Sequence, residues 1–187
     1  MSIIDGIVAA SPKTRARLTG AVYLAYFALA IGGAIAGSHS ATGRVVNIVS
    51  IAVYAGLTVL FYFMFEPVSR WVSLLAALFS FTGCVFSVVQ IVQGGKTPVS
   101  PLVFFGFYCL LLGQLVIRSR FLPVLLGLLL VVAGAGWLLF LFPFAAPLNG
   151  VTEVFGIVAE GALCLWLLIA GVKPVKKGKR GMRRVRG

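Results

Sequence analysis

The stretch VFGIVAEGALCLWLLIAGV, residues 154–172, is apolar along its whole length except for one charged side chain, Glu160. A helix of about 20 apolar residues is long enough to cross the hydrocarbon core of a bilayer. The helix of a soluble protein would instead carry a polar face toward water. The stretch therefore predicts a transmembrane helix, and the carboxyl group near its middle needs an explanation.

Five further apolar segments precede this one, so the sequence predicts spans at about 18–37, 45–65, 71–93, 99–117, 121–143 and 151–172. Of the 187 residues, 60% are hydrophobic and 11% are charged, which leaves too few polar side chains to cover a water-soluble domain. Backbone groups in lipid must be paired within their own segment, so spans of this length are helices. The predicted fold class is all-α, a polytopic bundle of six transmembrane helices occupying residues 18–172.

The basic residues predict the orientation of the chain, whose net charge is +12. With the N-terminus inside, 14 of the 16 Lys and Arg fall in cytoplasmic segments, and only Arg44 and Lys96 fall outside. An excess of basic residues marks the cytoplasmic side. We therefore expect a multi-pass protein of the cell inner (plasma) membrane, with residues 1–17 as a cytoplasmic N-terminal segment and both termini in the cytoplasm.

Half of the basic residues lie in the segment 173–187, which we expect to be a disordered cytoplasmic tail. Basic residues near anionic lipid contribute about 1 kcal/mol each to membrane binding, so the predicted partner of the tail is the inner leaflet. Basic arms can also bind nucleic acid, which we consider the weaker interpretation here. The lipid-contacting residues of the tail are Lys173, Lys176, Lys177, Lys179, Arg180, Arg183, Arg184 and Arg186.

The first span has a second interpretation, as a signal peptide. Basic residues at 13–17 precede an apolar stretch that ends at Ala34-Ile35-Ala36, which resembles a cleavage site. The apolar stretch is long for a signal peptide, so we favour a retained helix and leave cleavage as the alternative.

Small residues recur every three or four positions in the later spans and predict the faces that pack together. Close packing of small residues and interhelical hydrogen bonds hold membrane helices together. In the third span the stripe ends at Gln90, and in the fourth Gln114 lies beside it; both are candidates for interhelical hydrogen bonds. The small residues are Ser73, Ala76, Ala77, Ser80, Gly83, Cys84 and Ser87 in the third span, Gly106, Cys109 and Gly113 in the fourth, and Gly127, Gly134 and Gly136 in the fifth.

Glu160 and Glu153 are the candidate functional carboxyls. They are two helical turns apart and share a face, with Glu160 about 10 Å deeper in the membrane. An ionised carboxylate at mid-membrane costs at least about 2.5–3.5 kcal/mol, so Glu160 must be protonated, paired or hydrated. Because no cationic residue is expected at the same depth, we predict protonation or a hydrogen bond to Ser, Thr or Gln. The carboxyl could carry protons or only join helices.

Residues that would support catalysis or cofactor binding are few. His39 is the single histidine, no metal-binding or nucleophile motif is present, and Glu153 and Glu160 lie too far apart for a carboxylate dyad. The three cysteines lie in apolar runs, where they are expected to pack as small hydrophobes. We therefore predict no catalytic residues, no metal, no cofactor and no enzymatic activity.

Several segments resemble a bacterial integral-membrane family called domain of unknown function 4386. The resemblance rests on Arg118-Ser119, Phe121-Leu122-Pro123 with Gly127 and Gly134, on the last helix with Glu160-Gly161, and on residues 18–24 and 67–70. It covers about residues 15–172 and implies the same topology. It implies no chemistry, because that family has no established activity.

Three classes of function follow from the sequence. The favoured one is a structural or accessory membrane protein, acting as a homo-oligomer or with a membrane partner. The alternative is a small transporter or channel, proton-linked through Glu160. A membrane enzyme is the least favoured.

Overall fold

The structure is a computed structural model that describes residues 11–37, 40–95 and 97–172. These residues form helices and connections with no strand, and six helices are long and apolar enough to cross a membrane, as predicted. The tail 173–187 and His39 lie outside the described residues. The α-helices are α2 (Pro12–Ile35), α3 (Ala41–Phe65), α4 (Arg70–Val92), α5 (Pro101–Ser119), α6 (Val124–Leu138) and α7 (Asn149–Ile169), and the 3-10 helices η1 (Leu139–Leu141) and η2 (Pro143–Leu148) join α6 to α7.

Serine residues begin three of the helices. Ser11, Ser40 and Ser100 each precede a helix, and each hydroxyl accepts a hydrogen bond from a backbone N–H in the first turn. Such caps satisfy donors that have no partner inside the helix. The cap at Ser11, followed by a proline at the first helical position, starts α2 six residues before the predicted span.

The fifth span is a shorter α-helix than the predicted 121–143. It begins after Pro123 and gives way to η1 and then to an extended residue, Phe142, before Pro143. A residue that precedes proline is pushed from helical toward extended backbone. The two prolines therefore set the limits of this span more closely than its hydropathy does.

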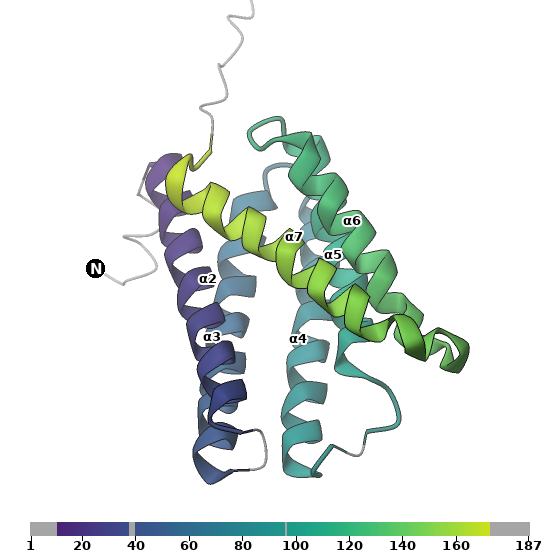
Figure 1. Ribbon diagram of the computed structural model, residues 1–187. Coiled ribbons are helices and arrows are strands. Elements are labelled where there is room, and N and C mark those ends of the chain that lie inside the picture. The colour runs from purple at the N-terminus through teal and green to yellow at the C-terminus, as the bar shows by residue number, and fades with distance from the viewer. Residues whose placement is uncertain (1–10, 38–39, 96, 173–187) are drawn as a thin grey trace, which may run out of the picture.

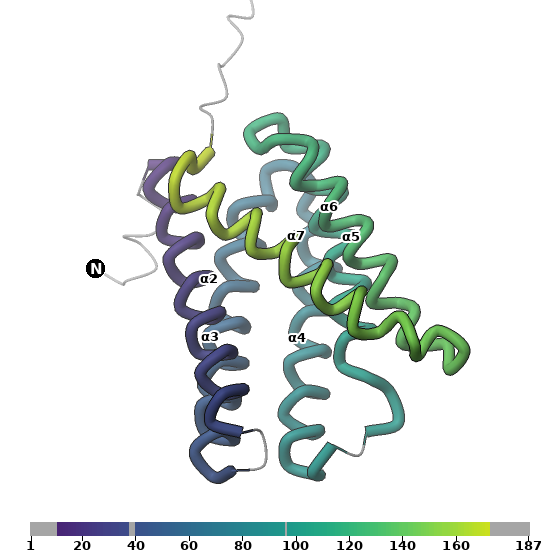
Figure 2. The backbone as a smooth tube through the Cα atoms, viewed as in Figure 1, coloured from purple at the N-terminus to yellow at the C-terminus, as the bar shows by residue number. Residues whose placement is uncertain are grey.

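The six helices form a closed bundle in which each helix packs on its sequence neighbours and α7 returns to pack on α2 (Figure 1). Two ends can be followed in Figure 2. One, which we call the terminal end, carries the start of α2, the α3–α4 and α5–α6 turns and the end of α7. The other, the distal end, carries the α2–α3 and α4–α5 connections. In both figures, drawn from the same side, α7 runs obliquely across the bundle, and it packs on α6 and on α2.

Close backbone approach joins α5 to α6. A Cβ atom added at Gly113 would lie 2.7 Å from the carbonyl oxygen of Gly127, and one at Gly134 would lie 2.6 Å from that of Gly106. Both distances are too short for a side chain, so these glycines allow the two helices to touch. The predicted small-residue faces of the fourth and fifth spans therefore pack against each other.

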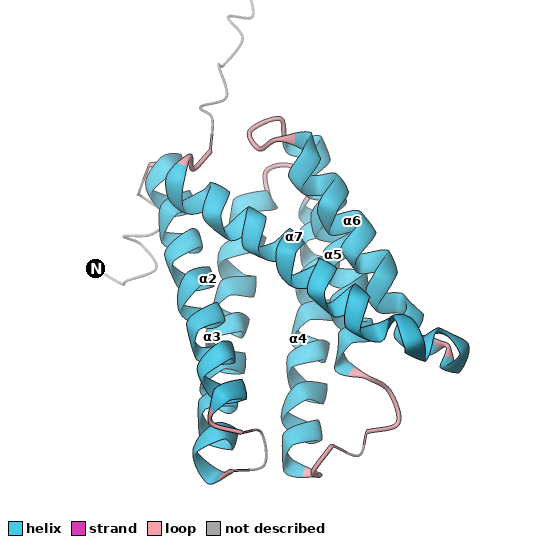
Figure 3. Cartoon of the chain, viewed as in Figure 1, coloured by secondary structure: helices cyan, strands magenta, loops and turns pink. Residues whose placement is uncertain are grey.

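The predicted stripe on the third span also faces inward. Six of its seven small residues are buried on α4, and Ser87 is half-buried, as is Gln90. The large exposed side chains are instead Leu, Ile, Val and aromatic residues along the outer faces, such as Ile35, Leu125 and Val151. Figure 3 shows the connections gathered beyond the ends of the helices. This distribution is that of a bundle that faces lipid.

Candidate functional site

Glu160 lies at the centre of the bundle, on the inward face of α7. The residue is 4% exposed. The hydroxyl of Tyr23 on α2 donates a hydrogen bond to Oε2 at 2.5 Å, and the thiol of Cys109 on α5 makes a weak contact with Oε1 at 3.7 Å. Glu160 therefore connects three helices that are far apart in the sequence.

The hydrogen bond expected for Glu160 is present, but the partners are a tyrosine and a cysteine, not the Ser, Thr or Gln that was predicted. Among the described residues the ion pair found is Glu66–Arg70, with Nε to Oε1 at 3.9 Å, on the exposed α3–α4 turn. The central carboxyl is thus held by neutral donors.

Aromatic rings surround this carboxyl on the α2 and α3 side. The ring of Tyr23 is stacked at 5.2 Å from that of Phe27 and meets Phe61 edge-on at 5.8 Å. Tyr54 lies 4.7 Å from Tyr26 and 5.2 Å from Phe105, measured between ring centroids. Edge-to-face and offset pairs of this kind fix ring positions and add to the packing energy.

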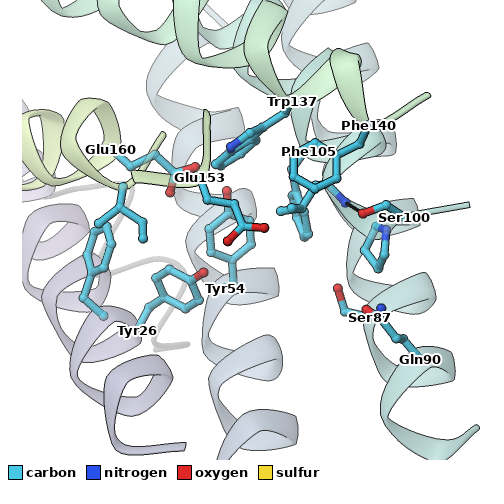
Figure 4. Close-up of a pocket in the computed structure, with 14 residues that line it drawn as sticks. Tyr26, Tyr54, Ser87, Gln90, Ser100, Phe105, Trp137, Phe140, Glu153 and Glu160 are labelled. Atoms are coloured by element: carbon cyan, nitrogen blue, oxygen red, sulfur yellow. Dashed lines mark hydrogen bonds between the residues drawn. The ribbon is translucent and has the colours of Figure 1, made fainter. Parts of the chain in front are cut away.

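A cavity of about 580 Å³ extends from Glu160 toward the distal end, and all six membrane spans contribute to its walls (Figure 4). Two carboxyls, Glu160 in its depth and Glu153 two turns along α7, line it together with polar and aromatic side chains. In Figure 4 both carboxyls project from α7, across from Tyr26 and Tyr54. The other lining residues are Phe27, Ser87, Gln90, Ser100, Pro101, Leu102, Phe105, Trp137, Phe140 and Ile157.

A second cavity, of about 250 Å³, adjoins the first. The two share five lining residues, among them Tyr54 and Gln90, and the second adds Asn47, Ser50 and Cys84. Ser87 and Gln90, at the distal end of the α4 stripe, thus line both cavities. In the terminal half, by contrast, the void bounded by Phe65, Leu112 and Leu115 measures about 10 Å³. The two larger cavities described here therefore lie toward the distal end of the bundle.

The structure brings three of the four predicted intramembrane residues to this site. Glu160, Glu153 and Gln90 line the cavity, whereas Gln114 is half-buried toward the terminal end of α5 and does not. In the described part of the chain, neither glutamine side chain makes the predicted interhelical hydrogen bond. Gln90 instead faces the hollow.

Trp137 lies on α6 and points into the bundle. The residue is 6% exposed and packs against Gly156 of α7, where its indole fills the space that a side chain would occupy. It lines the cavity, and its Nε1–H has no hydrogen-bond partner in the described structure. The hydroxyls of Tyr108 and Ser73 are also buried, and no described residue is a hydrogen-bond partner of either.

Sequence reasoning missed the tyrosines that complete the site. Tyr23, Tyr26 and Tyr54 sit in the middle of their helices, not at the membrane interfaces where tyrosine is enriched. A tyrosine at mid-membrane needs a partner for its hydroxyl. The position of Tyr23 in the middle of its helix was therefore the signal that could have linked its hydroxyl to Glu160.

The site offers no metal-binding cluster within residues 11–37, 40–95 and 97–172, where no three His, Cys, Asp or Glu side chains come together. The three cysteines are buried and free. The carboxyls of the site can accept hydrogen bonds and bind cations, and its aromatic rings can contact a ligand with their faces.

Comparisons with known proteins place these features in a family. The family described as "Domain of unknown function (DUF4386)" matches residues 98–171, which run from the start of α5 to the end of α7 and include Glu153 and Glu160. That range is narrower than the predicted resemblance over 15–172. An "Uncharacterized protein" of Archaeoglobus fulgidus is 31% identical over 126 residues, which are 63% of this chain and 76% of the relative. No solved structure matches the chain. The chain thus belongs to the family described as domain of unknown function (DUF4386).

Proposed function

We propose that the protein is a small membrane transporter that binds a solute in the cavity extending from Glu160 toward the distal end. The single observation that carries this proposal is a hollow of about 580 Å³ that reaches a buried intramembrane carboxyl. Cavities of about 300–1,000 Å³ are the usual size of small-molecule sites. Ionisable groups inside a membrane bundle commonly mark the path of a solute or a proton.

The distribution of basic residues supports an outward-facing orientation of this cavity. The 14 to 2 bias argues for a plasma-membrane protein with both termini in the cytoplasm. In that orientation the distal end is outside, so the hollow half opens to the exterior. The half that faces the cytoplasm is packed by Phe65, Leu112 and Leu115. This asymmetry is what one state of an alternating-access cycle would have.

A role for Glu160 in proton coupling follows from its surroundings. Its neutral donors, Tyr23 and Cys109, allow the carboxyl to be either protonated or ionised. Glu153 and Glu160 face a hollow and not a reaction centre of converging nucleophile and base, so we propose transport and not catalysis.

Proteoliposomes loaded with a fluorescent pH indicator test the transport role. Wild-type protein is exposed in turn to amines, amino acids, sugars and carboxylates, and the internal pH is followed. We expect one class to move protons in the wild type and not in Glu160→Gln, with Glu66→Gln as the control because Glu66 lies outside the cavity. A wild-type protein that moves protons with none of these classes contradicts the proton-linked version.

A second candidate is the structural or accessory role, favoured by the three-helix junction at Glu160. The bonds to Tyr23 and Cys109 tie α2 and α5 to α7, the helix that closes the bundle. If this were the only role, Glu160→Gln would lower the stability of the protein and leave every solute flux unchanged. We also propose that the basic tail contacts anionic lipids at the inner leaflet and that the bundle assembles as a homo-oligomer or with a membrane partner.

A further inference from the structure

We propose that the solute recognised by this cavity is an organic cation with an apolar body. This inference rests on the proposed function, because it names the class of molecule that binds in the cavity beside Glu160.

The charge of the lining is the first argument. Among the described residues, the formal charges that line the cavity come from two carboxyls, Glu153 and Glu160, and no Lys, Arg or His lies in its walls. This is notable in a chain whose net charge is +12. An anion in the cavity would lie beside carboxylates with no counter-charge, whereas a cation would neutralise them.

The aromatic walls are the second argument. Six aromatic side chains line the cavity, and Tyr26, Tyr54 and Phe105 form a continuous group with centroids 4.7 and 5.2 Å apart. Cations with an organic body bind to the faces of such rings. A sugar or another highly polar solute would need many more hydrogen-bond partners than this lining provides.

The unused hydrogen-bonding capacity of the lining is the third argument. Tyr23 occupies Oε2 of Glu160, whereas Oε1 has only the long, weak contact with Cys109. A carboxylate oxygen accepts more than one hydrogen bond, so Oε1 can accept from a ligand.

The cavity is too large and has too few carboxyls to fit a bare metal ion. Calcium needs six to eight oxygen ligands at about 2.3–2.6 Å, and two carboxyls two turns apart in a hollow of about 580 Å³ do not provide them. An organic cation fills this volume and places one charge near Glu160. The elongated arrangement of Glu153 and Glu160 suits entry past the outer carboxyl and binding at the inner one.

Three probes of similar shape and different charge test the proposal on the full-length protein in detergent. Isothermal titration calorimetry compares tetraphenylphosphonium, tetraphenylborate and neutral triphenylphosphine oxide. We expect the protein to bind tetraphenylphosphonium at least about tenfold more tightly than either of the others, because only the cation gains the attraction of the carboxyls.

Variants then locate the binding. Glu160→Gln is expected to weaken tetraphenylphosphonium binding at least about tenfold, and Glu153→Gln about two- to fivefold because Glu153 is more exposed and more screened. Tyr54→Leu removes an aromatic face and should weaken binding, whereas Tyr54→Phe keeps the face and should not. Glu66→Gln, outside the cavity, is the control and should bind as the wild type does.

The outcomes separate this inference from the proposed function. Preferential binding of the borate or of the neutral probe, weakened by Tyr54→Leu, would overturn the cationic class and keep the cavity as a solute site. Cation binding that is equal in the wild type, Glu160→Gln and Tyr54→Leu would place the probe elsewhere and overturn the inference. Absence of binding of all three probes would overturn the inference, and the proton-flux measurement then decides the transport role by itself.

Discussion

Replacing Tyr23 by Phe removes one oxygen atom from the centre of the bundle and should destabilise the protein measurably. The hydroxyl is buried and donates the 2.5 Å hydrogen bond to Oε2 of Glu160. Tyr108 provides a matched control, because its ring is equally buried, at 2% exposed, and its hydroxyl has no partner in the described structure. The two substitutions remove the same atom from different surroundings.

The expected magnitudes follow from what each hydroxyl does. Tyr23→Phe leaves a carboxyl oxygen buried without its donor, which costs about 1–3 kcal/mol in soluble proteins, while side-chain hydrogen bonds in membrane bundles reach about 1.7 kcal/mol. We therefore expect a loss of about 1–2 kcal/mol in the free energy of unfolding. Tyr108→Phe removes an unpaired polar atom, so we expect a change near zero or a gain of up to about 1 kcal/mol.

Unfolding in mixed micelles with increasing sodium dodecyl sulfate measures both values. Cys109 and Cys164 are buried and line neither cavity, so in a Cys84→Ala background the reaction of their thiols with a fluorescent maleimide reports unfolding. A double-mutant cycle with Glu160→Gln isolates the Tyr23–Glu160 interaction, and we expect a coupling of about 0.5–2 kcal/mol. Equal destabilisation by Tyr23→Phe and Tyr108→Phe, or a coupling of zero, would refute this account of the junction.

Three further predictions concern packing, the surface and the tail. Gly113→Ala should lower the free energy of unfolding by about 1–3 kcal/mol, because its Cβ would press on Gly127. Gly56→Ala, with open space around it, should raise the free energy of unfolding by up to about 1 kcal/mol. Micelle unfolding that ranks the two variants the other way would contradict the α5–α6 contact. Glu66→Gln should change stability by less than about 1 kcal/mol, since the pair with Arg70 is exposed, and a larger loss in the same assay would show that this turn matters more than its geometry indicates. Binding of a peptide of residues 173–187 to anionic vesicles should fall steeply between low and high salt, and binding that is insensitive to salt would count against an electrostatic contact.

The architecture was predictable from sequence because membrane insertion imposes a strong local rule. Each span needs about 20 apolar residues, and each predicted segment overlaps one of the six helices. The small-residue stripe on α4 also faces inward as predicted, since helical periodicity alone decides which residues share a face. Boundaries were less predictable where Ser11 and Pro123 set them by local backbone chemistry.

The site was predictable only in part because it is assembled from all six spans. Glu160 could be singled out by its cost in lipid, and Glu153 by its spacing along the same helix. The partners of Glu160, by contrast, depend on how α7 crosses the bundle and meets α2, which no local pattern encodes.

The central claim is that a solute can reach the cavity beside Glu160 from the distal end, on the outer side of the membrane. Ser87 lines both cavities, and a cysteine in its place can be labelled once Cys84, which lines the second cavity, is changed to alanine. Right-side-out and inside-out vesicles carrying Cys84→Ala with Ser87→Cys are treated with a membrane-impermeant thiol reagent. We predict labelling in right-side-out vesicles and none in inside-out vesicles, with Cys84→Ala alone unlabelled in both. Labelling only in inside-out vesicles, or in neither, would contradict the account.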